Sequence, residues 1–121
     1  MKKLLLALAL LTTSNVHAIA GGQLLGWCLT PNSDEFASSA QAVCVGFITG
    51  VGNAHNVMIA NKMIEPLYCI TEPLTNAEIV GVAADFFKRN PSKMHLDAAE
   101  LTLAALIEAY PNTASCKLAQ S

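Results

Sequence analysis

The sequence has 121 residues, 53% of them hydrophobic, and its nine acidic and seven basic side chains give a net charge of −2 with neutral histidines. This length predicts a single domain with a modest hydrophobic core. The acidic balance argues against nucleic acid as a partner, because nucleic-acid binding uses lysine and arginine side chains to neutralise phosphates.

The first eighteen residues have the three parts of a secretory signal peptide. A basic start at Met1 to Lys3 precedes an unbroken apolar run from Leu4 to Leu11, and Val16 to Ala18 supplies the small residues of a cleavage site. The apolar run is about half of the roughly 20 residues that a membrane-spanning helix needs. We therefore expect cleavage after Ala18, or after Ala20, and a single periplasmic domain over 19–121 without a membrane anchor. That domain keeps five basic and nine acidic residues, a net charge of −4.

Four cysteines lie in the exported part: Cys28, Cys44, Cys69 and Cys116. An even number of cysteines outside the cytoplasm predicts two disulfides. A zinc site is the competing interpretation, but structural zinc sites gather their ligands in close pairs and these cysteines are dispersed. We therefore expect disulfides and no metal.

Chain geometry limits how the cysteines can pair. If Cys44 sits inside a long helix, the path from it to Lys62 climbs about 27 Å. The seven residues up to Cys69 can retrace at most about 24 Å, so a Cys44–Cys69 bond is strained. Two pairings remain, Cys28–Cys44 with Cys69–Cys116 and Cys28–Cys69 with Cys44–Cys116. The first is favoured because it is more local.

The longest helical pattern runs from Phe36 to Lys62, with Ser33 as its expected N-cap. Its predicted buried stripe consists of apolar residues three and four apart: Phe36, Ala40, Val43, Phe47, Val51, Ala54 and Met58. Beside the stripe lie small residues that would let another backbone approach closely: Ala42, Gly46, Gly50 and Gly52. Each helical glycine costs roughly 1 kcal/mol relative to alanine, so a packed neighbour is expected to offset that cost.

Two capping boxes predict the other main helices. Thr75 with Glu78, and Asp97 with Glu100, each place a capping side chain three residues before a carboxylate that can return the bond. Prolines 91 and 111 end these helices. Their predicted buried residues are Ile79, Val82, Ala83 and Phe86 in the first, and Leu103, Leu106, Ile107 and Tyr110 in the second.

A shorter helix is expected over 24–29, after a loose segment at 19–23. No segment shows the period-two alternation of a strand. The sequence therefore predicts an all-α fold, a small helical bundle around one long central helix, stapled by two disulfides.

The sequence contains no pattern typical of a catalytic centre or a cofactor site. His55 and His95 lack a partner at helical spacing that would make either one a general base, and His55 is expected to be a surface or partly buried hydrogen-bonding residue. The glycines from Gly46 to Gly52 lack the preceding strand and glycine-rich turn of a dinucleotide site. The residues alone therefore support no catalytic mechanism and no cofactor.

The order of these features resembles the Rap1a/Tai family, immunity proteins of type VI secretion systems. The resemblance covers nearly the whole exported part. It rests on the Trp27-Cys28 pair, the Cys44 to Val51 segment CVGFITGV, Cys69, the Thr75 helix start, Phe86-Phe87, Asn90-Pro91, His95-Leu96 and Tyr110-Pro111. It implies a small, helical, disulfide-bonded periplasmic protein, commonly a homodimer, that binds a cognate peptidoglycan amidase toxin and blocks its active site.

Two loops are the candidate partner-binding segments under this resemblance. The apolar linker before Cys69 is expected to fold beneath the core, or else to present Leu67 and Tyr68 as anchors to a partner. The loop from Asn90 to His95 is expected to be exposed. The candidate residues are Met63, Ile64, Glu65, Leu67, Tyr68, Ser92, Lys93 and Met94.

Two other functions fit the sequence. A periplasmic acid-stress chaperone would use protonation of carboxylates to unfold partly and hold client proteins at low pH. A helical subunit of an envelope complex is the third possibility. Suppression of client aggregation at low pH would separate the chaperone from an immunity protein.

Overall fold

A computed structural model describes residues 18–113 and 116. This part of the chain contains the α-helices α2 (Gly21–Cys28), α3 (Ala37–Ala60), α4 (Asn76–Arg89) and α5 (Ala98–Ala109). Loops connect the helices, and a 3₁₀ turn, η1 (Pro91–Lys93), lies between α4 and α5. The predicted signal peptide lies outside the described residues, apart from Ala18. The prediction of an all-α fold is confirmed.

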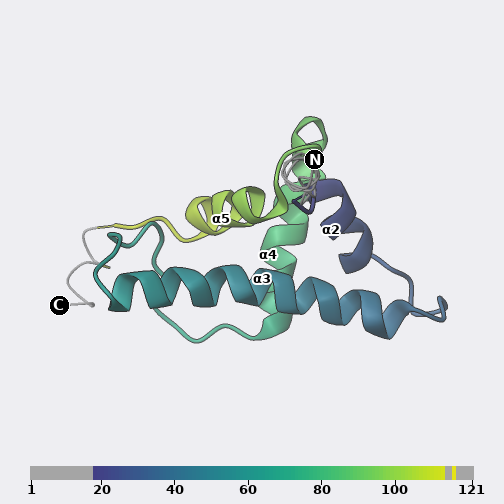
Figure 1. Cartoon of the computed structure of the whole chain (residues 1–121), viewed down its shortest axis with the longest axis horizontal. Helices are drawn as coiled ribbons and strands as arrows, with labels where there is room; N and C mark the ends of the chain where they lie inside the picture. Colours follow the sequence, from purple (N-terminus) through teal and green to yellow (C-terminus); the bar gives the residue numbers. More distant parts are fainter. Residues whose placement is uncertain (1–17, 114–115, 117–121) are drawn as a thin grey trace, which may run out of the picture.

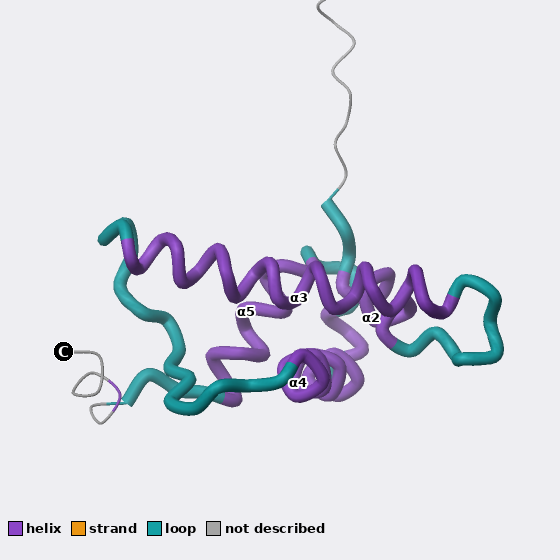
Figure 2. The backbone as a smooth tube through the Cα atoms, turned by 90° about the horizontal axis from the view of Figure 1, so that it is seen from below, coloured by secondary structure: helices purple, strands orange, loops and turns teal. Residues whose placement is uncertain are grey.

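The 24-residue α3 is the longest helix, and the other helices pack on it. Figure 1 shows α2 along its N-terminal half, α5 along its C-terminal half and α4 crossing it steeply. Figure 2, turned by 90°, shows α4 end-on beside α3. The helices enclose one core: Leu24, Cys44, Ile48, Ala83, Phe86, Phe87, Ala98, Leu101 and Ala105.

The buried side of α3 differs from the predicted stripe. Its buried residues are Ala37, Cys44, Ile48, Gly52 and His55. Three members of the predicted stripe are exposed instead: Phe36, Val43 and Ala54. The two faces are about one residue, or roughly 100° of helical rotation, apart. Small side chains occupy much of the inner face because they allow neighbouring helices to approach closely, and the larger apolar residues flank them.

The start of α3 also differs from the prediction. The helix begins at Ala37, and Ser33 does not cap it. The Asp34 carboxylate accepts a hydrogen bond from the Phe36 N–H at 2.8 Å, which fixes the turn before the first helical residue.

The outer face of α3 is apolar and uncovered in this structure. Phe36, Val43 and Val57 are 65%, 47% and 59% exposed. A side chain added at Gly46 or Gly50 would meet open space, so the predicted close approach at these two glycines does not occur within the chain. By length and composition alone α3 could cross a membrane, with a mean hydropathy of 1.4 over its 18-residue window, 22% of which is buried.

The segment expected to be loose, 19–23, is docked onto the start of α5. The Ile19 carbonyl accepts from the Ala98 N–H at 2.8 Å, and the Gly21 N–H donates to the Leu96 carbonyl at 2.9 Å. A Cβ at Gly21 would collide with the end of the Leu101 side chain, which would have to move to admit any other residue. The helix α2 therefore starts at Gly21, three residues earlier than predicted.

Both predicted capping residues cap their helices. The Thr75 hydroxyl accepts from the Glu78 N–H at 3.2 Å, and the Glu78 carboxylate accepts from the Thr75 N–H at 2.7 Å, which completes the capping box. These bonds lower the pKa of Glu78. The Asp97 carboxylate accepts from the N–H groups of Ala99 and Glu100. Among the described residues the Glu100 side chain returns no bond, so the second box is half formed.

The buried faces of α4 and α5 agree with the predicted ones only at Ala83, Phe86 and Leu106. In α4 the buried residues are Ala83, Ala84, Phe86 and Phe87. In α5 they are Ala98, Leu101, Thr102, Ala105 and Leu106. Ile107, predicted to be buried, is 39% exposed. The helices approach each other over alanine and threonine, as α3 does over its own small residues.

The structure joins Cys28 to Cys44 and Cys69 to Cys116, the two pairs that the sequence favours. The Cα atoms of the pairs are 5.2 Å and 6.1 Å apart, within the usual range for disulfides. The first bond fixes α2 to the middle of α3. The second ties the segment after α5 to the linker that follows α3.

Candidate interaction site

The described part of the chain contains neither a cluster of metal-binding side chains nor a free cysteine. Among residues 18–113 and 116, no group of three His, Cys, Asp or Glu side chains is placed to hold a metal ion. The four cysteines are all in disulfides. The candidate site is instead the loop after α3, which contains the first set of predicted partner-binding residues and is held by several long-range contacts.

A Schellman motif ends α3 and starts this loop. The Lys62 N–H donates to the Ile59 carbonyl and the Met63 N–H donates to the Met58 carbonyl, each at 2.9 Å. This geometry needs a left-handed residue, and Lys62 has φ 56° where glycine is usual. A non-glycine residue in this conformation is strained by about 1–2 kcal/mol. The strain falls directly before the exposed loop.

His55 anchors the loop from the α3 side. Its Nε2 accepts a hydrogen bond from the Leu67 N–H at 3.1 Å, so the neutral ring carries its proton on Nδ1. Burial lowers the pKa of His55 below 6.5, and the Asn56 side chain acts in the opposite direction with a smaller effect. The His55 ring stacks on Tyr68 with centroids 4.1 Å apart. The sequence gives no local signal for this role, since twelve residues separate His55 from Leu67.

The segment after α5 anchors the loop from the other side. The Asn112 amide donates to the Pro66 carbonyl at 2.7 Å, and the Cys69 N–H donates to the Tyr110 carbonyl at 2.8 Å. An isolated β-bridge pairs Tyr68 with Pro111. The Cys69–Cys116 disulfide follows directly. The loop backbone is therefore held from two sides.

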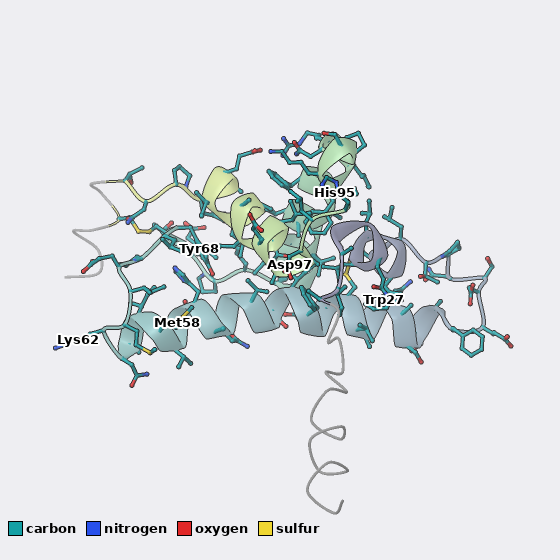
Figure 3. The ribbon with its side chains drawn as sticks, turned by 45° about the horizontal axis from the view of Figure 1, so that its top comes forward. Trp27, Met58, Lys62, Tyr68, His95 and Asp97 are labelled. Atoms are coloured by element: carbon teal, nitrogen blue, oxygen red, sulfur yellow. A yellow bond between two sulfur atoms is a disulfide. The ribbon has the colours of Figure 1, made fainter. Side chains whose placement is uncertain are left out.

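The anchored backbone presents some predicted residues and buries another. Met63 is 70% exposed, Leu67 is 43% exposed and Glu65 is also exposed, whereas Ile64 is half-buried. Tyr68 is buried, contrary to the expectation that it could contact a partner. Figure 3 shows Tyr68 between α3 and α5 and Lys62 pointing outward at the end of α3. Tyr68 therefore supports the loop, and burial raises its pKa, which keeps the phenol neutral.

The second predicted segment lies elsewhere. Ser92 and Lys93 are exposed in η1, and Lys93 Nζ lies 6.0 Å from the centre of the Phe86 ring. Met94 is half-buried, and its carbonyl accepts from the Gly22 N–H at 2.9 Å, so it holds α2 in place. Figure 1 shows the two segments at opposite ends of α5. The structure therefore does not bring the two predicted segments together.

These features define a small, helical, disulfide-bonded domain with an exposed loop anchored on both sides, a form suited to binding another protein. Residues 20–112 match the family of Rap1a immunity proteins. The chain therefore belongs to the Rap1a immunity protein family, as its sequence predicts. Immunity proteins bind a cognate effector toxin and inhibit it; they are not enzymes. Comparisons with curated proteins and with solved structures gave no match.

Proposed function

We propose that this chain is a periplasmic immunity protein of a type VI secretion system, which binds a cognate peptidoglycan amidase and covers its active site. Family membership supports the immunity role over the chaperone alternative. The two disulfides fit an oxidising compartment outside the cytoplasm. The observation that carries the mode of action is the loop 63–67, whose exposed side chains stand on a backbone fixed before binding.

A fixed backbone matters because ordering a flexible loop on binding costs free energy. The loop presents two large apolar side chains, Met63 and Leu67, around the acidic Glu65. The side chains of Met63 and Leu67 can enter the active-site cleft of the amidase, and the Glu65 carboxylate can accept a hydrogen bond from a donor in that cleft. Blocking an amidase by this route requires no chemistry from the immunity protein.

The test is inhibition of the amidase encoded beside this chain's gene. Leu67→Glu places a second charge in the loop but keeps the N–H that donates to His55, so the fold is expected to persist. Inhibition should weaken by at least about tenfold, the effect of ~1.4 kcal/mol. The matched control is Leu29→Glu, because Leu29 is a similarly exposed leucine, at 49%, directly after α2. Equal inhibition by both variants would refute the role of the loop.

We further propose that the outer face of α3 forms a homodimer. Phe36, Val43, Gly50 and Val57 recur every seven residues on this face, the spacing at which two helices pack along a common seam. The open space at Gly50 would admit a side chain of the second helix. A dimer would also place two copies of the loop on one assembly. Analytical ultracentrifugation should show a dimer for the natural chain and a monomer for Val43→Glu, and a dimer for both would assign the interface to another face.

A further inference from the structure

A groove separates α3 from the segment that returns to α4. Its volume is about 660 Å³, within the usual range for ligand sites of roughly 300–1,000 Å³. Buried Gly52, His55 and Tyr68 lie among its lining residues. Figure 1 shows the return segment running beside α3 towards the start of α4. The anchored loop 63–67 is not among the lining residues, so the groove is a separate feature.

One wall of the groove is the loop segment 70–74, which bends at Glu72. All five of its residues line the groove. Within the described part of the chain, no hydrogen bond engages the backbone N–H or C=O groups of these residues. Pro73 has no N–H, so this wall offers five free carbonyl groups and four free N–H groups.

The opposite wall and the rim carry neutral amides. Asn53 and Asn56 project from α3, and Asn76 starts α4. All three residues are exposed. A side-chain amide both donates and accepts, so it matches a peptide group. The lining residues include one acid, Glu72, and neither lysine nor arginine. This charge disfavours an anionic ligand.

A buried donor lies among the lining residues. The Nδ1–H of His55 has no hydrogen-bond partner in the described part of the chain. An unpaired buried donor costs free energy, and a carbonyl oxygen that reaches it would remove that cost. At Gly52, which also lines the groove, a Cβ would make only ordinary contacts with the Tyr68 hydroxyl and Ile79.

We propose that this groove binds an extended peptide segment of neutral or basic composition. The main chain of the peptide pairs with the free backbone N–H and C=O groups of residues 70–74. Asn53 and Asn56 bond the peptide groups on its other side, and Glu72 favours a basic side chain near its own position. The proposal does not depend on the toxin-blocking role of the loop 63–67.

The experiment selects phage-displayed random heptapeptides on the folded, oxidised protein. Selected sequences, made as capped synthetic peptides, are then measured by isothermal titration calorimetry. Asn53→Trp and Thr71→Trp fill the groove from its two walls and should each weaken binding by at least about tenfold. Asn61→Trp is the matched control, because Asn61 is an exposed asparagine near the end of α3 that does not line the groove. Its affinity should stay within about twofold of the natural chain.

A further variant separates binding from folding. In His55→Gln the side-chain oxygen can still accept from the Leu67 N–H, but no N–H remains at the position of Nδ1. Peptide affinity should fall, while a cooperative unfolding transition shows that the variant is folded. Recovery of no peptide, enrichment of acidic peptides, or equal binding to Asn53→Trp and the natural chain would each overturn the proposal.

Discussion

The two disulfides should differ in their contribution to stability, because they close loops of different length. The sequence separations are 47 for Cys69–Cys116 and 16 for Cys28–Cys44. A crosslink stabilises mainly by removing conformational entropy from the unfolded chain, roughly as 2.1 + 1.5R ln n cal/mol/K. This gives about 4 kcal/mol for the longer loop and about 3 kcal/mol for the shorter one at 25 °C. The expected difference is about 1 kcal/mol.

The measurement compares urea unfolding of two double variants. One combines Cys69→Ala with Cys116→Ala, the other combines Cys28→Ala with Cys44→Ala, and each keeps the other disulfide. Alanine avoids burying a new polar group, which matters because Cys44 and Cys116 are both almost fully buried. Loss of the longer crosslink should lower the free energy of unfolding more and raise the m-value more, since the unfolded chain expands further. A larger loss for the Cys28–Cys44 variant would refute the entropic reasoning and assign its effect to packing between α2 and α3.

Three other changes test single contacts. Lys62→Gly should relieve the left-handed strain after α3 and raise stability by about 0.5–1 kcal/mol in thermal unfolding; a lower midpoint would contradict the Schellman geometry. Thr75→Ala should cost about 1 kcal/mol through loss of the α4 cap, and a titration followed by NMR should show the pKa of Glu78 rising towards its ordinary value. Burial lowers the pKa of His55, so as pH falls the unfolded chain binds a proton at this residue before the folded chain does. The free energy of unfolding should therefore be unaffected by His55 above about pH 6.5 and should decrease as pH drops below it. His55→Gln should remove this part of the pH dependence. Free energies of unfolding that change in parallel for the variant and the natural chain from about pH 7 to about pH 5 would contradict the burial of a neutral ring.

Local chemistry explains which parts of the fold were predictable. Thr75 and Asp97 cap their helices because the capping contacts lie within three residues of each other. The prolines likewise act on their own neighbours. Rise per residue and chain length excluded a Cys44–Cys69 bond, and the observed pairing is the more local of the two that remained. These signals do not require knowledge of how the helices pack.

The buried faces were harder to predict because hydrophobicity alone does not identify the closest contacts. The predicted stripes followed the larger apolar residues, such as Val43 in α3 and Ile107 in α5, and both are exposed. The innermost positions include Ala37, Gly52 and Ala105. A short side chain contributes little to a hydrophobic pattern but permits a short distance between helix axes. The choice between these faces depends on the partner helix, which a single sequence does not show.

The interaction loop depended on contacts that are remote in sequence. The bond from Asn112 to Pro66 spans 46 residues, and the bridge from Tyr68 to Pro111 spans a similar length. His55 and Tyr68 carry no sign in the sequence that they stack. The exposure of the loop and the burial of Tyr68 therefore followed only from the assembled fold.

The docking of residues 19–22 onto the start of α5 bears on where the predicted signal peptide would end. A cut after Ala18 would make Ile19 the first residue and keep its carbonyl on the Ala98 N–H. A cut after Ala20 would delete that bond and the bridge between Ala20 and Asp97, and Gly21 would become the terminus. The two residues between the predicted cuts thus belong to the folded domain, and the position of a cut would decide whether the first N–H of α5 keeps its partner.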